Sequence, residues 1–178
     1  MKDDLINIIK KMDGNVFTLG IVDKDIINAV QNNKNIKDYL MLNINSTVNY
    51  ENIQNCKPVK KVKISKIKKK NKKKKIDYTV CEISDCKDYF KTFINDTIYF
   101  NKKNIYYYGD TSSYELDTLI KKYRRYNVNI EILKYPNNEF ILKIDTTKAK
   151  TNRLKAFIYR MNDNFLGFID FLSDFLTS

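Results

Sequence analysis

The sequence predicts a mixed α/β fold, because segments with strand-like and helical periodicity follow one another along the chain. Apolar and polar residues alternate at 62–67 and again at 76–80, which is typical of strands. Residues 113–126 instead repeat apolar side chains at three- and four-residue spacing, as an amphipathic helix does. Since 43% of the 178 residues are apolar, the chain can bury a core, and we expect one domain with extensions.

The first third of the chain predicts a small helical unit. Residues 4–12 form an amphipathic helix candidate, and Asp23 is placed to cap a second helix that follows it. A third helix is expected at 34–42, and the polar residues 43–56 are interpreted as a linker. Such a unit has too little apolar surface to be stable alone.

The middle of the chain predicts a β-hairpin with a basic tip. The strand-like segments at 62–67 and 76–80 flank residues 68–75, which are lysine except for Asn71. Residues 57–75 contain twelve lysines and no acid. Outside this segment the remaining 21 basic residues balance the 21 acidic ones, so the net charge of +12 lies entirely within it. We expect the tip to be solvated until an anion binds.

The second half of the chain continues the alternation of helices and strands. Helices are expected at 84–96 and 113–126, strands at 97–100 and 104–108 around a turn at 101–103, and strands at 129–134 and 139–144 around a turn at 136–138. Within the second strand, Tyr107 is expected to face opposite to Tyr106 and Tyr108. Core and cross-strand packing is the first interpretation of these rings, and stacking on nucleic-acid bases is the alternative.

The C-terminal residues 151–176 predict a long amphipathic helix. Seven apolar residues between Leu154 and Phe175 recur at three- and four-residue spacing. A stripe with so many aromatic rings has to be covered. Packing against the domain and docking to a partner protein both remain open.

The composition excludes several classes of function. Histidine is absent, which rules out histidine-based catalytic triads and histidine-ligated metals. Cys56, Cys81 and Cys86 are odd in number and lack a CxxC pair, so we expect reduced thiols in a cytoplasmic protein and no metal site. No apolar run approaches the length of a membrane span. No constellation of residues supports an enzyme.

Several motifs between residues 59 and 133 follow one another in a fixed order. A strand and the lysine loop precede Thr79 and Val80, and after a helix the pair Gly109-Asp110 closes a strand before the helix at 114–123. In this order residues 59–133 resemble the translation initiation factor 1 family, whose domain also occurs in density-regulated protein and ligatin-type factors. The chain departs from that family at Glu82-Ile83, where the family usually has Gly-Leu.

The resemblance implies a small α/β sandwich, with one sheet and two helices packed on one face. This domain would cover residues 59–145. Residues 1–55 would form a helical arm or a degenerate module, and residues 151–178 a C-terminal helix. The resemblance also implies a factor that is not an enzyme, needs no cofactor, and binds the small ribosomal subunit near the decoding site. Thr79, Val80, Gly109 and Asp110 would be structural motif residues.

The basic residues fit an RNA partner independently of that resemblance. Lysines neutralise phosphates and release counterions, which makes binding salt-dependent and independent of sequence. Small-subunit ribosomal RNA is the first candidate partner and initiator tRNA a second. A general nucleic-acid-binding accessory protein is the alternative function, and a solvated or targeting segment is the alternative for the lysine run. The basic cluster at the end of the helix at 113–126 is equally explained by helix-end stabilisation. The candidate RNA-binding residues are Lys66, Lys68, Lys69, Lys70, Lys72, Lys73, Lys74, Lys75, Lys121, Lys122, Arg124 and Arg125.

Overall fold

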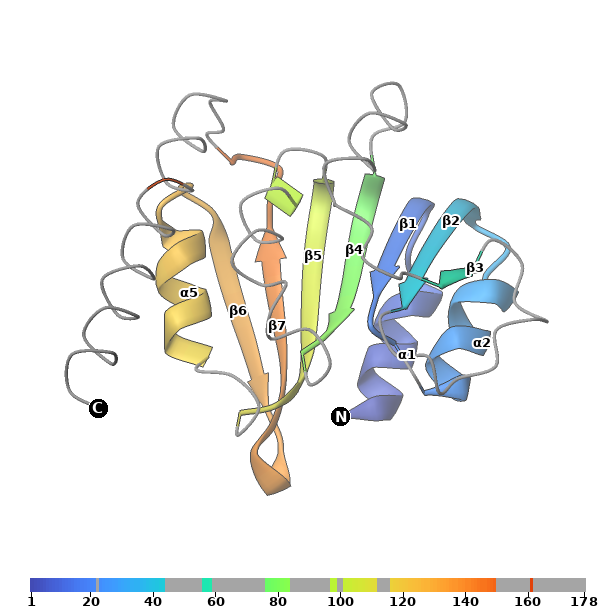
Figure 1. Cartoon of the computed structure of the whole chain (residues 1–178), viewed down its shortest axis with the longest axis horizontal. Coiled ribbons are helices and arrows are strands. Elements are labelled where there is room, and N and C mark those ends of the chain that lie inside the picture. The colour runs from blue at the N-terminus through green and yellow to red at the C-terminus, as the bar shows by residue number, and fades with distance from the viewer. Residues whose placement is uncertain are drawn as a thin grey trace, which may run out of the picture.

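The computed structural model describes residues 1–21, 23–43, 56–58, 76–83, 97–98, 101–111, 116–149 and 161 (Figure 1). Its strands are β1 (Gly14–Leu19), β2 (Ile36–Asn43), β3 (Cys56–Pro58), β4 (Ile76–Glu82), β5 (Asn101–Asp110), β6 (Asn129–Lys134) and β7 (Glu139–Asp145). Its helices are α1 (Lys2–Lys10), α2 (Lys24–Asn32) and α5 (Leu116–Arg124), and a short 3₁₀ turn, η2 (Pro136–Asn138), joins β6 to β7.

All seven strands belong to one sheet, in the order β3-β2-β1-β4-β5-β7-β6. The first five of these in space are parallel, and β7 runs antiparallel between β5 and β6. The chain therefore starts at the centre with β1, moves outward to β3, returns to β4 and then builds the other half. Parallel neighbours need crossover connections, and α2 is the described helix that connects β1 to β2.

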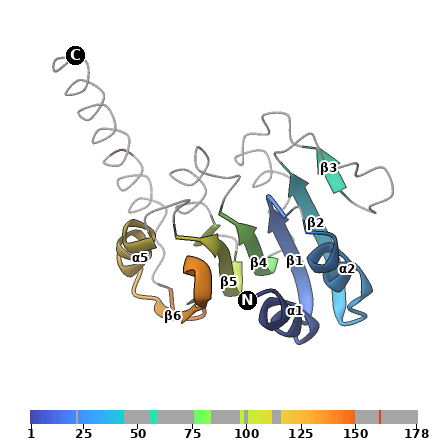
Figure 2. The ribbon, with the colours of Figure 1, turned by 90° about the horizontal axis from the view of Figure 1, so that it is seen from below.

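Helices cover both faces of the sheet (Figure 2). On one face, α1 and α2 bury Leu5, Ile9 and Ile26 against β1, β4 and β5. On the other face, α5 buries Leu119 and Tyr123 in a cluster that includes strands β1, β5 and β7. The central strands are accordingly buried on both sides, as expected for parallel strands in a doubly covered sheet.

The tyrosines of β5 divide between these two layers. Tyr107 is fully buried on the α5 face, where its hydroxyl bonds to that of Tyr123, with ring centroids 5.8 Å apart. Tyr106 and Tyr108 are buried on the opposite face with α1 and α2. The predicted opposite orientation of Tyr107 is confirmed, and all three rings pack in the core.

The fold class predicted from the sequence is wrong. The small sheet with two helices on one face is replaced by a seven-stranded sheet with helices on both faces. The expected N-terminal helical arm instead contributes two strands, β1 and β2, to the middle of that sheet. Residues 34–42 were expected to be helical, but β2 is a strand whose partners, β1 and β3, lie far from it in sequence.

The predicted strand pairing of the basic hairpin is also wrong. Strand β4 contains the expected segment 76–80, but it lies between β1 and β5 and pairs in parallel with both. Neither edge of β4 is left for a strand at 62–67, which itself lies outside the described residues. The turn expected at 101–103 is absent as well, because β5 runs continuously through it and Thr97 and Ile98 are helical.

Other local expectations match the structure. Asp23 caps α2, α5 lies within the expected helix at 113–126, and β6 and β7 form the expected antiparallel pair. Asn137 and Asn138 in the turn both have positive φ, 63° and 62°, which asparagine tolerates better than most residues. The expected helices at 84–96 and 151–176 lie outside the described residues, except Met161, which is helical and exposed.

We expect Gly14→Ala to destabilise the protein, because Gly14 starts β1 with φ +104°. A Cβ atom there would lie 2.3 Å from Oδ2 of Asp77, the carboxylate that accepts the N–H of Asn15 at 2.8 Å. Backbone strain of this kind costs about 1–3 kcal/mol before the steric clash is added. Chemical denaturation measures the change in the free energy of unfolding.

A double-mutant cycle with Asp77→Ala separates the two causes. If the clash contributes, Gly14→Ala costs less in the Asp77→Ala background than in the wild type. An unchanged unfolding midpoint for Gly14→Ala would contradict the argument.

Candidate functional site

The strand order places a candidate site between β1 and β4. From β1 the chain winds outward to β2 and β3, and from β4 it winds in the opposite direction to β5. In open α/β sheets, ligands bind outside the carboxyl ends of the strands where the winding direction reverses. That edge holds the turn after β1, the end of β4 and the end of β5, and we call it the carboxyl edge.

The turn after β1 is tight and apolar. Gly20 has φ +71°, a left-handed conformation that glycine adopts without strain, and it lets the chain leave β1 sharply. The next residue, Ile21, is only 3% exposed and packs with α1 and α2. Asp23 then ends the turn and begins α2.

The side chain of Asp23 caps the N-terminus of α2 by accepting hydrogen bonds from backbone N–H groups of its first turn. Its Oδ1 accepts the N–H groups of Asp25 at 2.8 Å and Ile26 at 3.3 Å. Lys2 of α1 contacts the same carboxylate at 3.0 Å and also bonds to Asp25. Partial burial raises the pKa of Asp23, but Lys2 and the two N–H groups outweigh burial and lower it overall. The carboxylate is therefore ionised at neutral pH.

The second carboxylate of the edge is Glu82, the last residue of β4. The hydroxyl of Tyr108 on β5 donates a hydrogen bond to its Oε2 at 2.8 Å. Tyr108 is 3% exposed, and burial together with the negative charge of Glu82 raises the pKa of its phenol far above the usual value. The phenol thus stays protonated and holds the carboxylate in place. Asp23 also contributes to this pKa shift, so both carboxylates act on the same buried ring.

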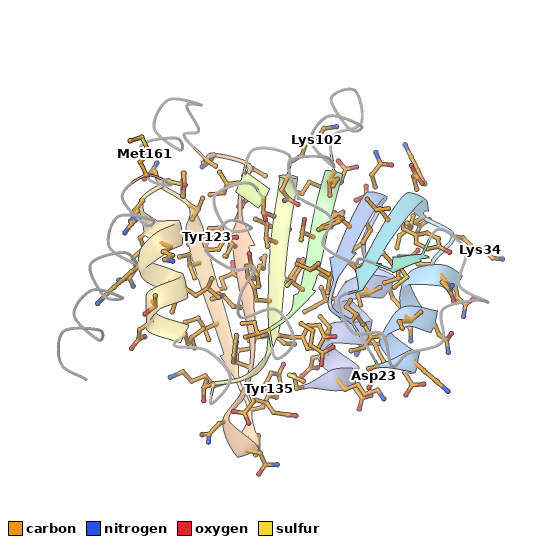
Figure 3. The ribbon with its side chains drawn as sticks, viewed as in Figure 1. Asp23, Lys34, Lys102, Tyr123, Tyr135 and Met161 are labelled. Carbon is orange, nitrogen blue, oxygen red and sulfur yellow. The ribbon has the colours of Figure 1, made fainter. Side chains whose placement is uncertain are left out.

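This arrangement suits a cationic ligand better than an anionic one. The helix N-terminus, which would otherwise attract an anion, already has two of its N–H groups bonded to Asp23. Glu82 at the end of β4 and Asp23 at the N-cap of α2 instead add negative charge beside the apolar turn, although Lys2 offsets part of the charge of Asp23. Figure 3 shows Asp23 at this edge, at the bottom of the view, with Lys102 at the opposite edge of the sheet.

The structure describes only four of the twelve residues that the sequence predicted to bind RNA. Lys121, Lys122, Arg124 and Arg125 lie in the last turn of α5 and just after it, at the edge opposite to Asp23 and Glu82. Thr79 and Val80 are buried in β4, and Gly109 and Asp110 end β5. The remaining candidate lysines lie outside the described residues: Lys66, Lys68, Lys69, Lys70, Lys72, Lys73, Lys74 and Lys75.

Sequence reasoning missed most of the candidate site. Asp23 was recognised only as a helix cap, and Glu82 only as a departure from a family pattern. The available signal was a single glycine, Gly20, between an apolar strand and a capped helix. That signal is weak because the second and third glycines of a nucleotide-binding turn are absent here.

Comparison with known proteins supports the assignment of the fold. No family model matches the chain, and no curated protein matches its sequence. Among solved structures, the METTL16 methyltransferase domain is 16% identical with a TM-score of 0.53, covering 82% of this chain and 64% of that one. TrmK from M. capricolum, solved with the cofactor product S-adenosyl-homocysteine, is 17% identical with a TM-score of 0.53, covering 85% and 72%. A methyltransferase from Pyrococcus furiosus is 9% identical with a TM-score of 0.54, covering 82% and 81%.

The chain has a Rossmann-like methyltransferase fold. Spermidine synthases share it, for example that of Thermotoga maritima, with 11% identity, a TM-score of 0.51 and coverage of 80% and 56%. The chain spans less than two thirds of the METTL16 domain and of this synthase. At these identities the likeness establishes the fold.

The functional expectations drawn from the sequence are corrected by this finding. The resemblance to translation initiation factor 1 is wrong, and with it the assignment as an initiation factor. The alternative of a general nucleic-acid-binding accessory protein is not favoured either. The expectation of a protein that is not an enzyme is contradicted, because the methyltransferase fold is one that enzymes use.

We expect Asp23→Ala to destabilise the protein by about 0.5–2 kcal/mol at pH 7, since it removes the cap of α2. Asp23→Asn is the matched control, because asparagine caps as well as aspartate but cannot pair with Lys2 as an anion. Wild type should therefore be more stable than Asp23→Asn at pH 7.

The difference in stability between the wild type and Asp23→Asn depends on pH, and the lowered pKa of Asp23 gives its direction. The folded pKa of Asp23 is lowered below 3.8, so its stabilisation is present above that value and is lost as the pH falls through the folded pKa. Thermal melts from pH 7 down to pH 2.5 measure the gap. A gap that persists at the lowest pH would show that the charge of Asp23 is not its source.

Proposed function

We propose that the protein is an S-adenosylmethionine-dependent methyltransferase whose cofactor binds at the carboxyl edge between β1 and β4. The observation that carries the proposal is the pair of carboxylates, Asp23 and Glu82, at the winding reversal of a methyltransferase fold. The edge is where ligands bind in such sheets, and its charge selects for a cation.

The residues of the edge fit this cofactor at its charged end. S-adenosylmethionine carries a positive sulfonium and an amino group, and Asp23 and Glu82 provide the opposite charge. Gly20 lacks a side chain at the point where β1 ends, so the backbone there is open to close approach.

When bound, the cofactor supplies an electrophilic methyl group on its sulfonium. Glu82 is held at the end of β4, where the hydroxyl of Tyr108 donates a hydrogen bond to its Oε2 at 2.8 Å, and its negative charge would face the positive end of the cofactor there. The N–H of Ile83 donates to the carbonyl oxygen of Tyr108 at 2.9 Å, which extends the β4–β5 pairing past Glu82 and fixes its backbone. Pre-organisation of this kind keeps the carboxylate in one position relative to a bound ligand.

RNA is the partner class that we retain. The twelve lysines of residues 57–75 support it, and a methyltransferase that acts on RNA would need such contacts. Small-subunit ribosomal RNA and initiator tRNA remain candidates within that class.

A protein partner for residues 151–176 and a cytoplasmic location are likewise kept as proposals. Among the residues that the structure describes, no helix is long and apolar enough to cross a membrane.

A binding assay with two ligands tests the proposed function. S-adenosylmethionine carries the sulfonium charge, whereas S-adenosylhomocysteine has a neutral thioether in its place. We expect the wild type to bind both in isothermal titration calorimetry. Glu82→Gln should weaken binding of S-adenosylmethionine about tenfold, which corresponds to roughly 1.4 kcal/mol, and should change binding of S-adenosylhomocysteine less than about threefold.

Glu131→Gln is the matched control. Glu131 is an exposed acid on β6 that pairs with Lys143 at 3.0 Å, away from the carboxylate pair. Its replacement should leave both affinities unchanged. A wild type that binds neither ligand would refute the function, and an equal loss of both ligands in Glu82→Gln would refute the interaction of Glu82 with the sulfonium.

A further inference from the structure

The first turn of α1 lies beside the candidate site. Only residues 11–13 separate α1 from β1, and this connection is too short to return along the strand, so α1 runs antiparallel to β1. Its first residue, Lys2, therefore lies near the carboxyl end of β1, where the turn to α2 begins. Figure 1 marks the N-terminal end of the chain at the bottom of the view, and Figure 3, drawn from the same side, labels Asp23 at that edge.

Lys2 bridges the two carboxylates at the start of α2. Its Nζ lies 3.0 Å from Oδ2 of Asp23 and also donates a hydrogen bond to Oδ2 of Asp25. The hydrogen bond to Asp25 is the main reason that the pKa of Lys2 is raised, and the bond to Asp23 is the second, so the side chain is an ammonium ion at neutral pH. One cation thus faces two anions, and one negative charge among these three residues is left unbalanced.

The two oxygens of Asp23 differ in how firmly their partners are fixed. Oδ1 accepts the N–H groups of Asp25 and Ile26, which belong to the backbone of α2 and cannot leave without loss of the cap. Oδ2 is bound by Lys2, whose side chain is 42% exposed and reaches the carboxylate on a flexible four-carbon stem. Oδ2 is therefore the atom of Asp23 whose partner can be exchanged.

Other contacts hold the first turns of α1 when Lys2 moves. Leu5 and Ile9 are fully buried in the core. The hydroxyl of Tyr135, just after β6, donates a hydrogen bond to Oδ2 of Asp4 at 2.8 Å. Exchange of the partner at Asp23 is thus a movement of one side chain and leaves the helix in place.

The ammonium of Lys2 occupies a position that also suits the amino group of the proposed cofactor. Both groups are ammonium ions with three N–H donors, and a carboxylate oxygen accepts from either one. S-adenosylmethionine and S-adenosylhomocysteine each carry such an amino group next to a carboxylate. For the ligand to use Oδ2 of Asp23, the bond between Lys2 and that oxygen has to break first.

We propose that Lys2 is an autoinhibitory residue, whose ammonium occupies Oδ2 of Asp23 in the unliganded protein and is displaced by the amino group of the cofactor. This inference rests on the proposed function and adds a competition within the same site. The apparent affinity for the ligand is then reduced by the fraction of molecules in which Lys2 does not hold Asp23. Because exposed ion pairs are weak, the reduction is modest, about threefold to fivefold.

Isothermal titration calorimetry of Lys2→Met with two ligands tests the competition. Methionine is similar in length to lysine but has no charge. S-adenosylhomocysteine carries the amino group, whereas methylthioadenosine keeps the adenosine and the thioether and lacks the amino acid end. We expect Lys2→Met to bind S-adenosylhomocysteine about threefold to fivefold more tightly than the wild type, and to leave binding of methylthioadenosine within about twofold.

Lys24→Met is the matched control. Lys24 directly follows Asp23 and is exposed, but the ion pairs that the structure describes for Asp23 and Asp25 are both with Lys2. This variant removes the same charge from the same edge without freeing Oδ2 of Asp23. Its affinity for S-adenosylhomocysteine should therefore stay within about twofold of that of the wild type.

Lys2→Arg is the conservative variant. Arginine restores a cation that reaches the two carboxylates, so Lys2→Arg should bind S-adenosylhomocysteine no more tightly than the wild type. A gain in affinity equal to that of Lys2→Met would show that the charge at this position does not compete. Thermal melts of all three variants show that each one is folded.

The other results also decide the proposal. Weaker binding of S-adenosylhomocysteine by Lys2→Met would show that Lys2 holds the carboxylate of the ligand, and unchanged binding would show that Lys2 does not compete. An equal gain for methylthioadenosine, or in Lys24→Met, would assign the effect to the turn or to net charge. Each of these overturns the autoinhibitory role and leaves the proposed function standing, whereas a wild type that does not bind S-adenosylhomocysteine at all would refute the proposed function itself.

Discussion

The parallel pairing of β1 with β4 is the constraint on which the rest of the structure depends. These strands pair from Val16 with Tyr78 to Leu19 with Cys81, although some sixty residues separate them. Asp77 supports the pairing at its start, where it accepts the N–H of Asn15 next to Gly14, whose φ is positive. Because both strands are parallel and central, each needs crossovers and helical cover, and their carboxyl ends meet where the winding reverses.

That meeting point explains why two carboxylates from distant segments act together. Asp23 follows the turn after β1, and Glu82 is the last residue of β4. Burial is the largest cause of the raised pKa of Tyr108 on β5, and the negative charges of both carboxylates raise it further. The same pairing brings the starts of the strands together at the other edge, where helix ends supply lysines and arginines. One topological choice therefore brings Asp23 and Glu82 to the same edge of the sheet.

Local patterns in the sequence predicted the elements whose cause is local. The cap at Asp23, the helix containing Leu119 and Tyr123, and the turn at Asn137-Asn138 depend on residues within one or two turns of one another. The opposite orientations of Tyr107 and its neighbours follow from strand geometry alone. The sequence also contained the concentration of net charge at residues 57–75.

The tertiary structure decided what no local pattern contains. Residues 34–42 have apolar side chains compatible with a helix, and they form β2 because β1 and β3 supply hydrogen-bond partners on both sides. Strand β4 looked like half of a hairpin, but its partners come from residues 16–19 and 101–108. For the same reason Glu82 had no visible partner until β5 placed Tyr108 beside it. By itself the sequence determined helix caps, turns, strand faces and the location of net charge, since these depend on near neighbours. The strand order and the candidate site depend on pairings between separate segments, across some sixty residues for β1 and β4, and only the folded chain decides those.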